Sequence, residues 1–233
     1  MTLADDRRVV VKTGGGDPEL EAEGLDALRE AGAPTPAVLG RTDALLVLEF
    51  VAGPENWNGL GRALAQCHRA TSDRFGWHRD NLIASLPQHN DRADRWSDFY
   101  LEHRLTPLLP ALPVQLRLRL EAAMTHRLPG LLDHDVRPSL LHGDLWSGNI
   151  VAGRWLIDPA VHYGDRELDL AMLDLFGSIP AAMQKGYDAV WPLDSGWQER
   201  RPALQLYHLL VHVQLFGSGY HRAVASRLDA IEA

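Results

Sequence analysis

The stretch Leu140-Leu-His-Gly-Asp-Leu-Trp-Ser-Gly-Asn-Ile150 decides how the rest of the chain is interpreted. An apolar run leads into His142 and Asp144, and four residues separate Asp144 from Asn149. A further apolar run then ends at a second aspartate, Asp158. The spacing His-x-Asp-x-x-x-x-Asn, followed by a strand that ends in Asp, is typical of the loops with which kinases transfer a phosphoryl group.

Phosphoryl transfer needs an aspartate that orients the attacking hydroxyl and accepts its proton, and oxygen ligands that hold Mg²⁺ on the phosphates. Asp144 fits the first role, Asn149 and Asp158 fit the second, and His142 would support the loop. A Gly-Asp pair can also be a simple turn. The Asp–Asn spacing, the flanking apolar runs and the downstream Asp158 occur together, and this combination favours the catalytic interpretation.

A lysine and a glutamate near the start of the chain fit the same chemistry. Residues 8–12 predict a β-branched strand that ends at Lys12, and residues 18–31 predict a helix that carries Glu21. Lys12 resembles the strand lysine that contacts the α- and β-phosphates of a nucleotide, and Glu21 is its expected ion-pair partner. Glu23 lies on another face of the helix. The alternative is a pair of ordinary exposed charges.

Three more positions are candidates for contacts with a nucleotide or an acceptor. Backbone groups at Glu49 and Val51, where a strand over residues 44–51 meets a linker, could hydrogen-bond adenine; the alternative is an ordinary strand end. Trp146 could form a wall for a sugar or could pack in the core. Asp169, near the start of a predicted helix, is expected to anchor the catalytic loop (residues 142–149). Four histidines lack metal-like spacing and are interpreted as structural: His78, His89, His208 and His212.

Composition limits the class of protein. The chain has 233 residues, a net charge of −8, 45% hydrophobic residues and no basic block. Nucleic acid is therefore not an expected partner. No apolar run reaches the roughly 18 residues that span a bilayer, so no membrane association is expected. The first residues lack the apolar core of a secretory signal and Cys67 is the only cysteine, which together favour the cytoplasm. The oligomeric state stays open.

The pattern of elements predicts an α+β protein with two lobes. Residues 1–52 read as strand, helix, strand, strand, with the third strand apolar almost throughout, as in a buried strand. Residues 53–233 are mainly helical and contain the catalytic loop, and residues 72–89 are expected to be irregular. Predicted helices begin near residue 60 and cover 95–109, 114–128 (ended by Pro129-Gly130), 167–176, 202–217 and the tail from 219.

Leu141-His-Gly-Asp-Leu-Trp-Ser-Gly-Asn149 resembles the catalytic loop of the fructosamine/ketosamine kinases, a branch of the aminoglycoside-phosphotransferase and protein-kinase-like superfamily. The segment that begins Asp158-Pro and continues Gly164-Asp-Arg-Glu167 resembles the metal-binding segment of that family. The resemblance covers about residues 9–225; Leu-Trp-Ser-Gly and Gly-Asp-Arg-Glu are its most specific parts. Further matching segments are Phe75-Gly-Trp-His-Arg-Asp-Asn81, Trp191-Pro-Leu193 and Leu206-Tyr-His-Leu-Leu-Val-His212.

This resemblance implies a protein-kinase-like two-lobe fold and ATP- and Mg²⁺-dependent phosphorylation of the 3-hydroxyl of a fructosamine or related ketosamine, free or protein-bound. The phosphorylated adduct then falls apart, so such enzymes are regarded as deglycating. Asp144 carries over as the base, Asn149 and Asp158 as Mg²⁺ ligands, Lys12 and Glu21 as the phosphate-positioning pair, and Trp146 as a substrate contact.

The chain departs from the family before Lys12. Two strands and a glycine-containing nucleotide loop are expected there, which need roughly twenty residues at ~3.3 Å per strand residue, whereas eleven residues precede Lys12. Gly14-Gly-Gly16 follows Lys12 and cannot be that loop. We therefore expect a shortened N-terminal lobe with an unprotected sheet edge and weak nucleotide affinity. Two alternatives follow: a small-molecule kinase for an aminoglycoside or aminoalcohol, and a catalytically impaired binding protein.

Overall fold

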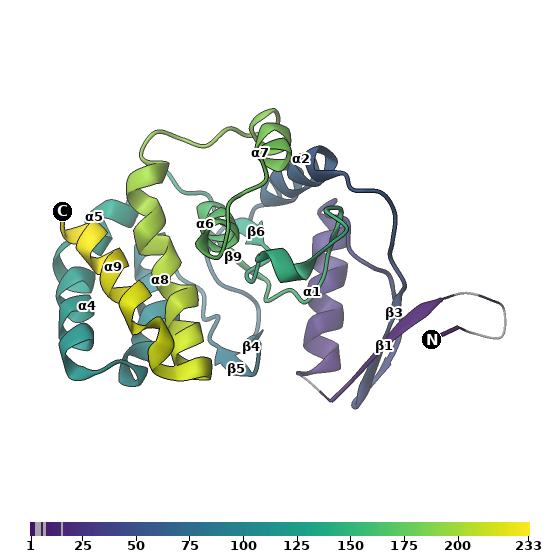
Figure 1. Cartoon of the computed structure of the whole chain (residues 1–233), viewed down its shortest axis with the longest axis horizontal. Coiled ribbons are helices and arrows are strands. Elements are labelled where there is room, and N and C mark those ends of the chain that lie inside the picture. The colour runs from purple at the N-terminus through teal and green to yellow at the C-terminus, as the bar shows by residue number, and fades with distance from the viewer. Residues whose placement is uncertain (3–5, 7, 15) are drawn as a thin grey trace.

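The computed structural model describes residues 1–2, 6, 8–14 and 16–233 and shows an α+β protein (Figure 1). Gly15, in the predicted loop after Lys12, lies outside the described residues. A three-stranded antiparallel sheet at one end has the order β1–β3–β2. Helix α1 runs beside it. These elements are β1 (Val9–Thr13), α1 (Pro18–Glu30), β2 (Val38–Thr42) and β3 (Leu45–Glu49).

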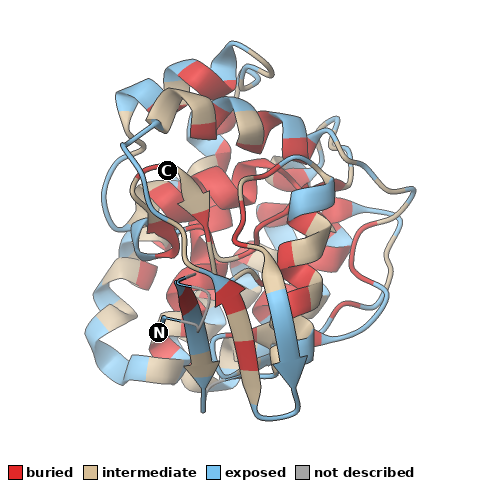
Figure 2. Ribbon diagram, turned by 90° about the vertical axis from the view of Figure 1, so that its right-hand side faces the viewer, coloured by how far each residue is buried: buried red, intermediate tan, exposed pale blue. Residues whose placement is uncertain are grey.

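Strand β3 is central to this sheet but is buried on one face only. Its burial alternates, with Leu46 and Leu48 buried and their neighbours partly or fully exposed. The buried face packs against Ala22 and Leu25 of α1, whereas the outer face is open (Figure 2). The prediction of a strand buried throughout was therefore wrong, because α1 covers only one side of the sheet.

Helix α1 has the start signals that its sequence predicts. The Asp17 side chain accepts a hydrogen bond from the Glu19 amide at 2.9 Å, and Pro18 occupies the first turn, where its missing N–H costs little. Gly32 follows the helix with a φ of 92°, a left-handed conformation that glycine adopts without strain. In mid-helix, a Cβ at Gly24 would approach Pro159 to 2.9 Å. Helix α1 therefore packs closely on the chain that follows Asp158.

The remainder of the chain forms a larger, mainly helical body around α8 (Trp197–Phe216), much of which is buried. Its other helices are α2 (Trp57–His68), α3 (Trp96–Phe99), α4 (Val114–His126), α5 (Leu128–Leu132), α6 (Glu167–Leu175), α7 (Ala181–Asp188) and α9 (His221–Glu232). The π- and 3₁₀-helical segments are η1 (Tyr100–Leu105), η2 (Thr106–Ala111), η3 (Ser147–Asn149) and η4 (Gly217–Tyr220). None of the helices that the structure describes is both long and apolar enough to cross a bilayer.

Three short antiparallel pairs place the loops of this body. They are β4 (Asn81–Ile83) with β5 (Leu86–Gln88), β6 (Ser139–Leu141) with β9 (His162–Gly164), and β7 (Ile150–Val151) with β8 (Trp155–Leu156). The β4–β5 hairpin corrects the prediction that residues 72–89 are irregular. Its turn uses Ala84 at a φ of 51°, and the paired strands are too short to give a periodic signal.

The predicted helix boundaries need three corrections. Residues 96–111 are helical, but they pass from α- to π- to 3₁₀-helix rather than forming one α-helix. Pro129-Gly130 do not end a helix; Pro129 lies in the first turn of the short helix α5, where a proline is tolerated. Helix α8 begins at Trp197, before the predicted start, and Pro202 is accommodated in its second turn.

We propose that residues 1–52 and 53–233 are the two lobes. The buried apolar residues support this division, because Ala22, Leu25, Leu46 and Leu48 form a small cluster separate from the main core, to which α1 contributes Leu28. The chain between Phe50 and Asn56 belongs to no helix or strand. Figure 1 shows this segment leading from the sheet to α2.

Candidate functional site

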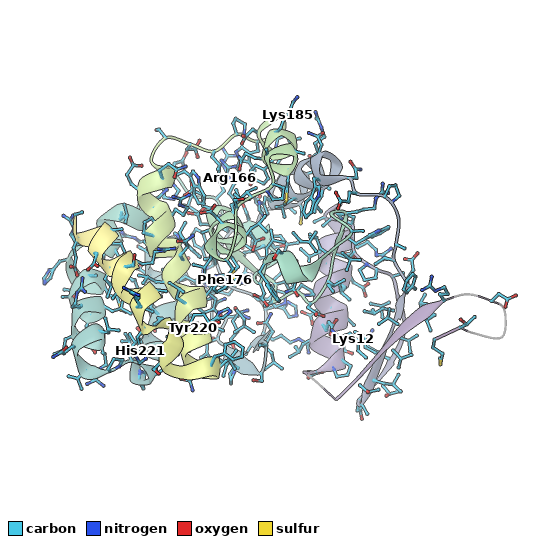
Figure 3. All side chains as sticks on the ribbon, viewed as in Figure 1. Lys12, Arg166, Phe176, Lys185, Tyr220 and His221 are labelled. Atoms are coloured by element: carbon cyan, nitrogen blue, oxygen red, sulfur yellow. The ribbon has the colours of Figure 1, made fainter. Side chains whose placement is uncertain are left out.

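One cleft collects most of the residues that the sequence singles out. It has a volume of about 860 Å³ and lies between the α1 end of the molecule and the helical body. Its lining includes six of the predicted site residues: Lys12, Glu21, Asp144, Trp146, Asn149 and Asp158. In Figure 3, Lys12 lies on one side and Phe176 and Tyr220 lie on the other.

A buried aspartate holds the backbone of the catalytic loop by hydrogen bonds. Asp169 of α6 accepts hydrogen bonds from the backbone amides of His142 at 2.7 Å and Gly143 at 2.9 Å. This confirms the predicted anchor. Burial opposes ionisation of Asp169, yet the hydrogen bond from His68, the neighbouring His68 and His142 rings and the Gly143 amide together hold its pKa below the usual value. The anchor is therefore a carboxylate that holds the loop by charge-assisted hydrogen bonds.

A second layer of hydrogen bonds holds Asp169 in turn. His68 Nε2 lies 3.2 Å from Asp169 Oδ2, and His68 Nδ1 lies 2.8 Å from the Tyr187 hydroxyl. His68 and Asp169 have fully buried side chains. Gly143 is also constrained, with a φ of 83°, and a Cβ there would approach the Ala160 carbonyl oxygen to 2.0 Å. The loop geometry is thus set by packing and by satisfied buried polar groups.

His142 joins the catalytic loop to the strand that leads to Asp158. Its Nε2 lies 2.9 Å from the Ile157 carbonyl oxygen, which can only accept, so the proton belongs on Nε2. Its Nδ1 can then accept from the Asp144 amide at 3.3 Å. Burial lowers the pKa of His142, which keeps the ring neutral in this pairing. The contacts fit the predicted supporting position, although His142 itself does not line the cleft.

Asp144 is a half-buried carboxylate next to Asn149. Asn149 Nδ2 donates to the Asp144 backbone oxygen at 2.9 Å and lies 3.3 Å from Asp144 Oδ2. Burial raises the pKa of Asp144 to about 6; the Asn149 hydrogen bond opposes this, and the nearby charges of Asp169 and Asp158 add to it. A carboxylate with this pKa is a better proton acceptor near neutral pH than an exposed aspartate.

The structure brings Lys12 and Glu21 together as the sequence predicts. Lys12 Nζ lies 2.7 Å from both carboxylate oxygens of Glu21. It also contacts Asp158, which sequence reasoning did not foresee. Burial lowers the pKa of Lys12 and is the largest single effect, but the hydrogen bonds and charges of Asp158 and Glu21 outweigh it, and the pKa is raised overall. The lysine is therefore fully charged at the cleft surface.

Asn149 and Asp158 supply the kind of ligands that Mg²⁺ prefers. The Ile157 amide donates to the Asn149 carbonyl oxygen at 3.1 Å, which ties the two segments together. Asp158 adopts a left-handed φ of 55°, which costs little for aspartate and is common at functional sites. Among the described residues, none donates a hydrogen bond to Asn149 Oδ1. An amide oxygen and a carboxylate from two residues that line the same cleft fit a hard divalent cation.

The two predicted adenine contacts lie elsewhere. Glu49 and Val51 are not among the described residues that line the cleft. The Glu49 amide already donates to the Ala37 carbonyl oxygen at 2.8 Å, and its side chain accepts from the Ala37 amide at 3.2 Å. Their contact with adenine stays a prediction.

Trp146 lies at the cleft and is 42% exposed. Its ring covers Gly148, where a Cβ would approach the indole to 2.3 Å. The glycine of the Leu-Trp-Ser-Gly segment therefore makes room for the indole. This position fits a wall for an acceptor better than it fits core packing.

Sequence reasoning missed the opposite wall of the cleft. His208, His212, Leu215 and Phe216 of α8 line it, together with Phe176 and Tyr220. Two of these residues, His208 and His212, were interpreted as structural. The available signal was helical spacing, since 208, 212, 215 and 216 share one face of a helix. Which neighbour that face meets depends on the fold, so spacing alone could not assign it.

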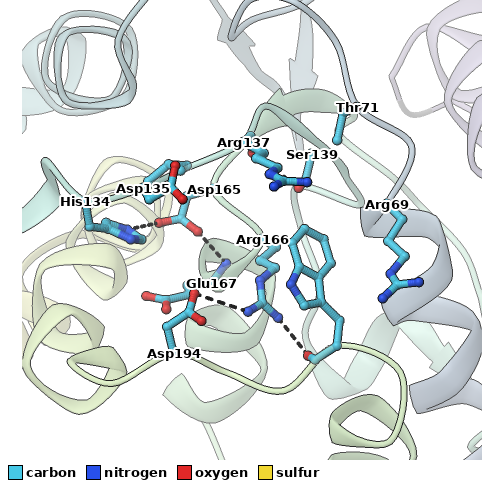
Figure 4. A pocket seen from close by; sticks show the side chains of 12 residues that line it. Arg69, Thr71, His134, Asp135, Arg137, Ser139, Asp165, Arg166, Glu167 and Asp194 are labelled. Atoms are coloured by element: carbon cyan, nitrogen blue, oxygen red, sulfur yellow. Dashed lines mark hydrogen bonds and ion pairs between the residues drawn. The ribbon is translucent and has the colours of Figure 1, made fainter.

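A second cavity, of about 530 Å³, is lined by His134, Asp165 and Glu167 among other residues (Figure 4). Their ligand atoms lie within 4.8 Å of one another. Both carboxylates already have hydrogen-bond partners within the protein. Glu167 accepts two hydrogen bonds from Arg200, at 2.6 and 2.7 Å. Asp165 accepts one from the Glu167 amide at 2.9 Å. These contacts identify the cluster as a structural support for the start of α6.

Comparison with known proteins identifies the family. The fructosamine kinase family model matches residues 18–233, nearly the whole chain. The chain belongs to the fructosamine kinase family. A probable ketoamine kinase of Synechocystis is 38% identical in an alignment that covers 90% of this chain and 77% of that protein. A probable ketoamine kinase of Thermus thermophilus is 35% identical in an alignment that covers 96% of this chain and 87% of that protein. Membership makes the chain a phosphotransferase and implies that ATP is the donor.

Solved structures agree with this family. A Thermobifida fusca protein assigned as a fructosamine-3-kinase superposes with a TM-score of 0.91 at 37% identity, covering 99% of this chain and 88% of that one. The aminoglycoside phosphotransferase APH(4)-Ia superposes with a TM-score of 0.62 at only 16% identity, so that likeness shows the fold alone. The predicted family and the predicted protein-kinase-like fold are both confirmed.

Proposed function

We propose that this kinase transfers the γ-phosphoryl group of ATP to a sugar hydroxyl of a ketosamine, the 3-hydroxyl of a fructosamine or a close relative. The observation that carries the proposal is the cleft in which Asp144, Asn149, Asp158 and the Lys12–Glu21 pair meet. The family and the names of the relatives support the choice of acceptor. Breakdown of the phosphorylated adduct would return the free amine, which is the deglycating outcome.

Each group has a separate task in this proposal. Asp144 accepts the proton of the acceptor hydroxyl, and the Asn149 amide orients its carboxylate. Lys12, held by Glu21, binds the phosphates. Asn149 and Asp158 would hold Mg²⁺, which neutralises charge on the transferred group when bound. Trp146 forms a flat apolar wall beside Asp144 on which a sugar ring can stack.

Nucleotide binding requires one exchange of partners. Lys12 contacts Asp158 in the present structure. Both groups are partly exposed, so the pair is screened by water and is weak. A bound nucleotide would give Lys12 a phosphate partner, and the Asp158 carboxylate would then be available to hold Mg²⁺. Glu21 remains beside Lys12 throughout and keeps the lysine positioned.

The test is a direct assay of ADP formation with Mg²⁺, ATP and a fructosamine, compared with an aminoglycoside and with choline as a simple aminoalcohol. We expect turnover with the fructosamine alone and phosphate on its 3-hydroxyl by NMR. Turnover only with the aminoglycoside or with choline would replace the proposed acceptor. A protein that binds no ATP and phosphorylates none of these acceptors would instead support the catalytically impaired binding protein.

A further inference from the structure

An aromatic group forms the wall of the cleft opposite Lys12. It consists of Phe176, which follows α6, His212 and Phe216 of α8, and Tyr220 of η4; we call it the aromatic wall. The His212 ring is central, with its centroid 4.6 Å from that of Phe176, 5.0 Å from Tyr220 and 5.5 Å from Phe216. Figure 3 shows Phe176 and Tyr220 on the same side of the molecule.

The aromatic wall is open to solvent. Phe216 is 65% exposed and Phe176 is 44% exposed, although both are large apolar side chains. Contiguous exposed apolar side chains of this size mark a binding surface more often than a passive one. The rings are also held in place, since His212 Nδ1 lies 2.7 Å from the His208 carbonyl oxygen and fixes the central ring.

The wall also contains an unmet hydrogen-bond acceptor. His208 lies one helical turn before His212 and also lines the cleft. Its Nε2 lies 3.0 Å from the Gly143 carbonyl oxygen and therefore carries the proton, which leaves Nδ1 as an acceptor. Within the described part of the chain, this buried Nδ1 has no hydrogen-bond partner. A ligand that brings an N–H or O–H donor to this wall would supply one.

We propose that the aromatic wall binds the amine part of the ketosamine, meaning the protonated nitrogen and the apolar or aromatic substituent that it carries. This inference rests on the proposed function. The Lys12 side of the cleft is taken by the nucleotide phosphates, and Asp144 with Trp146 takes the sugar. The aromatic wall is then the part of the cleft that is left to contact the substituent on nitrogen. Aromatic faces attract both an apolar chain and an adjacent ammonium group.

The test uses two fructosamines with the same sugar, one carrying a methyl group on nitrogen and one carrying a 2-phenylethyl group. We expect the wild-type protein to show a kcat/KM about tenfold higher for the phenylethyl substrate, through a lower KM. The substitutions Phe216→Ala and Tyr220→Ala should each reduce that ratio by about three- to tenfold. Phe216 is mostly exposed, so its truncation should not unfold the protein.

The matched control is Leu118→Ala, which removes a similarly exposed apolar side chain from α4, away from the cleft. This variant should leave the kcat/KM for both substrates unchanged. An unchanged substrate ratio in Phe216→Ala and Tyr220→Ala overturns the aromatic wall as the amine subsite. Absence of turnover with either substrate is instead a failure of the proposed function. In that case calorimetric titration with the phenylethyl compound decides: weaker binding to Phe216→Ala supports the subsite, and equal binding overturns it.

Discussion

The two sides of the catalytic centre are built differently. The catalytic loop is held by Asp169, which is held in turn by His68, and both of these side chains are fully buried. Lys12 and Asp158 meet across the cleft with side chains that are 34% and 44% exposed. The first region is fixed when the protein folds, because its polar groups have no alternative partners. The second is an exposed ion pair that water and ligands can separate. In the proposed function, the catalytic loop is therefore formed before substrates bind, whereas the nucleotide side would be completed only on binding.

The largest effect on stability should come from removing the buried anchor. Asp169→Ala takes away the acceptor for the His142 and Gly143 amides and for His68, each a hydrogen bond to a charged group. We expect the free energy of unfolding to fall by about 3 kcal/mol in urea denaturation. Asp158→Ala should change it by less than about 1 kcal/mol. Equal losses for both aspartates would remove the distinction between the two regions.

Substitutions on the nucleotide side should change the KM for ATP rather than the free energy of unfolding. Lys12→Ala should raise the KM for ATP at least about tenfold, the cost of a lost charge-assisted phosphate contact, while stability falls by less than about 1 kcal/mol. Arg41→Ala is the matched control, because the Arg41–Glu19 pair also joins a strand to α1 but lies outside the cleft. An unchanged KM in Lys12→Ala, or an equal rise in Arg41→Ala, would argue against a phosphate role for Lys12.

The raised pKa of Asp144 predicts a pH dependence of activity. The carboxylate must be ionised to accept a proton, so kcat/KM should rise with pH, bend near pH 6 and level off above it. One unit below the bend, the rate should be about tenfold lower. An asparagine cannot titrate, so the residual activity of Asp144→Asn should lack this bend. A profile that bends near pH 4, the ordinary aspartate value, would contradict a desolvated base.

The smallest effect should come from a contact that joins the two sides. Glu23 of α1 accepts from Trp77 Nε1 at 2.6 Å and pairs with Arg79, so it ties α1 to the helical body. Glu23→Ala removes both contacts and should loosen α1, so the KM for ATP should rise about threefold, a change of roughly 0.7 kcal/mol in nucleotide binding. Glu30→Ala, an exposed glutamate at the end of the same helix, should have no effect. Identical KM values for both variants would show that α1 needs no such tie.

That much of the candidate site lies together could be predicted, because the signals for it are local. The Asp144–Asn149 spacing lies within one loop, and the phase of α1 separates Glu21 from Glu23. The contact between Lys12 and Asp158 joins residues 146 positions apart, which no periodicity reveals. The aromatic wall combines the end of α6, one face of α8 and η4, so it exists only after packing. The β4–β5 hairpin was missed because three-residue strands carry too little alternation.

If Asp144 is the general base, ketosamine-dependent ADP formation must depend on its carboxylate, and the variant Asp144→Asn measures that dependence. The substitution keeps the side-chain shape and removes the proton acceptor. We expect kcat to fall about a thousandfold, within the range for loss of a general base, with ATP binding and the unfolding midpoint retained. Asp43→Asn, at an exposed turn between β2 and β3, is the matched control and should keep full activity. An Asp144→Asn enzyme that binds ATP and keeps kcat within tenfold of the wild type would show that Asp144 is not the general base.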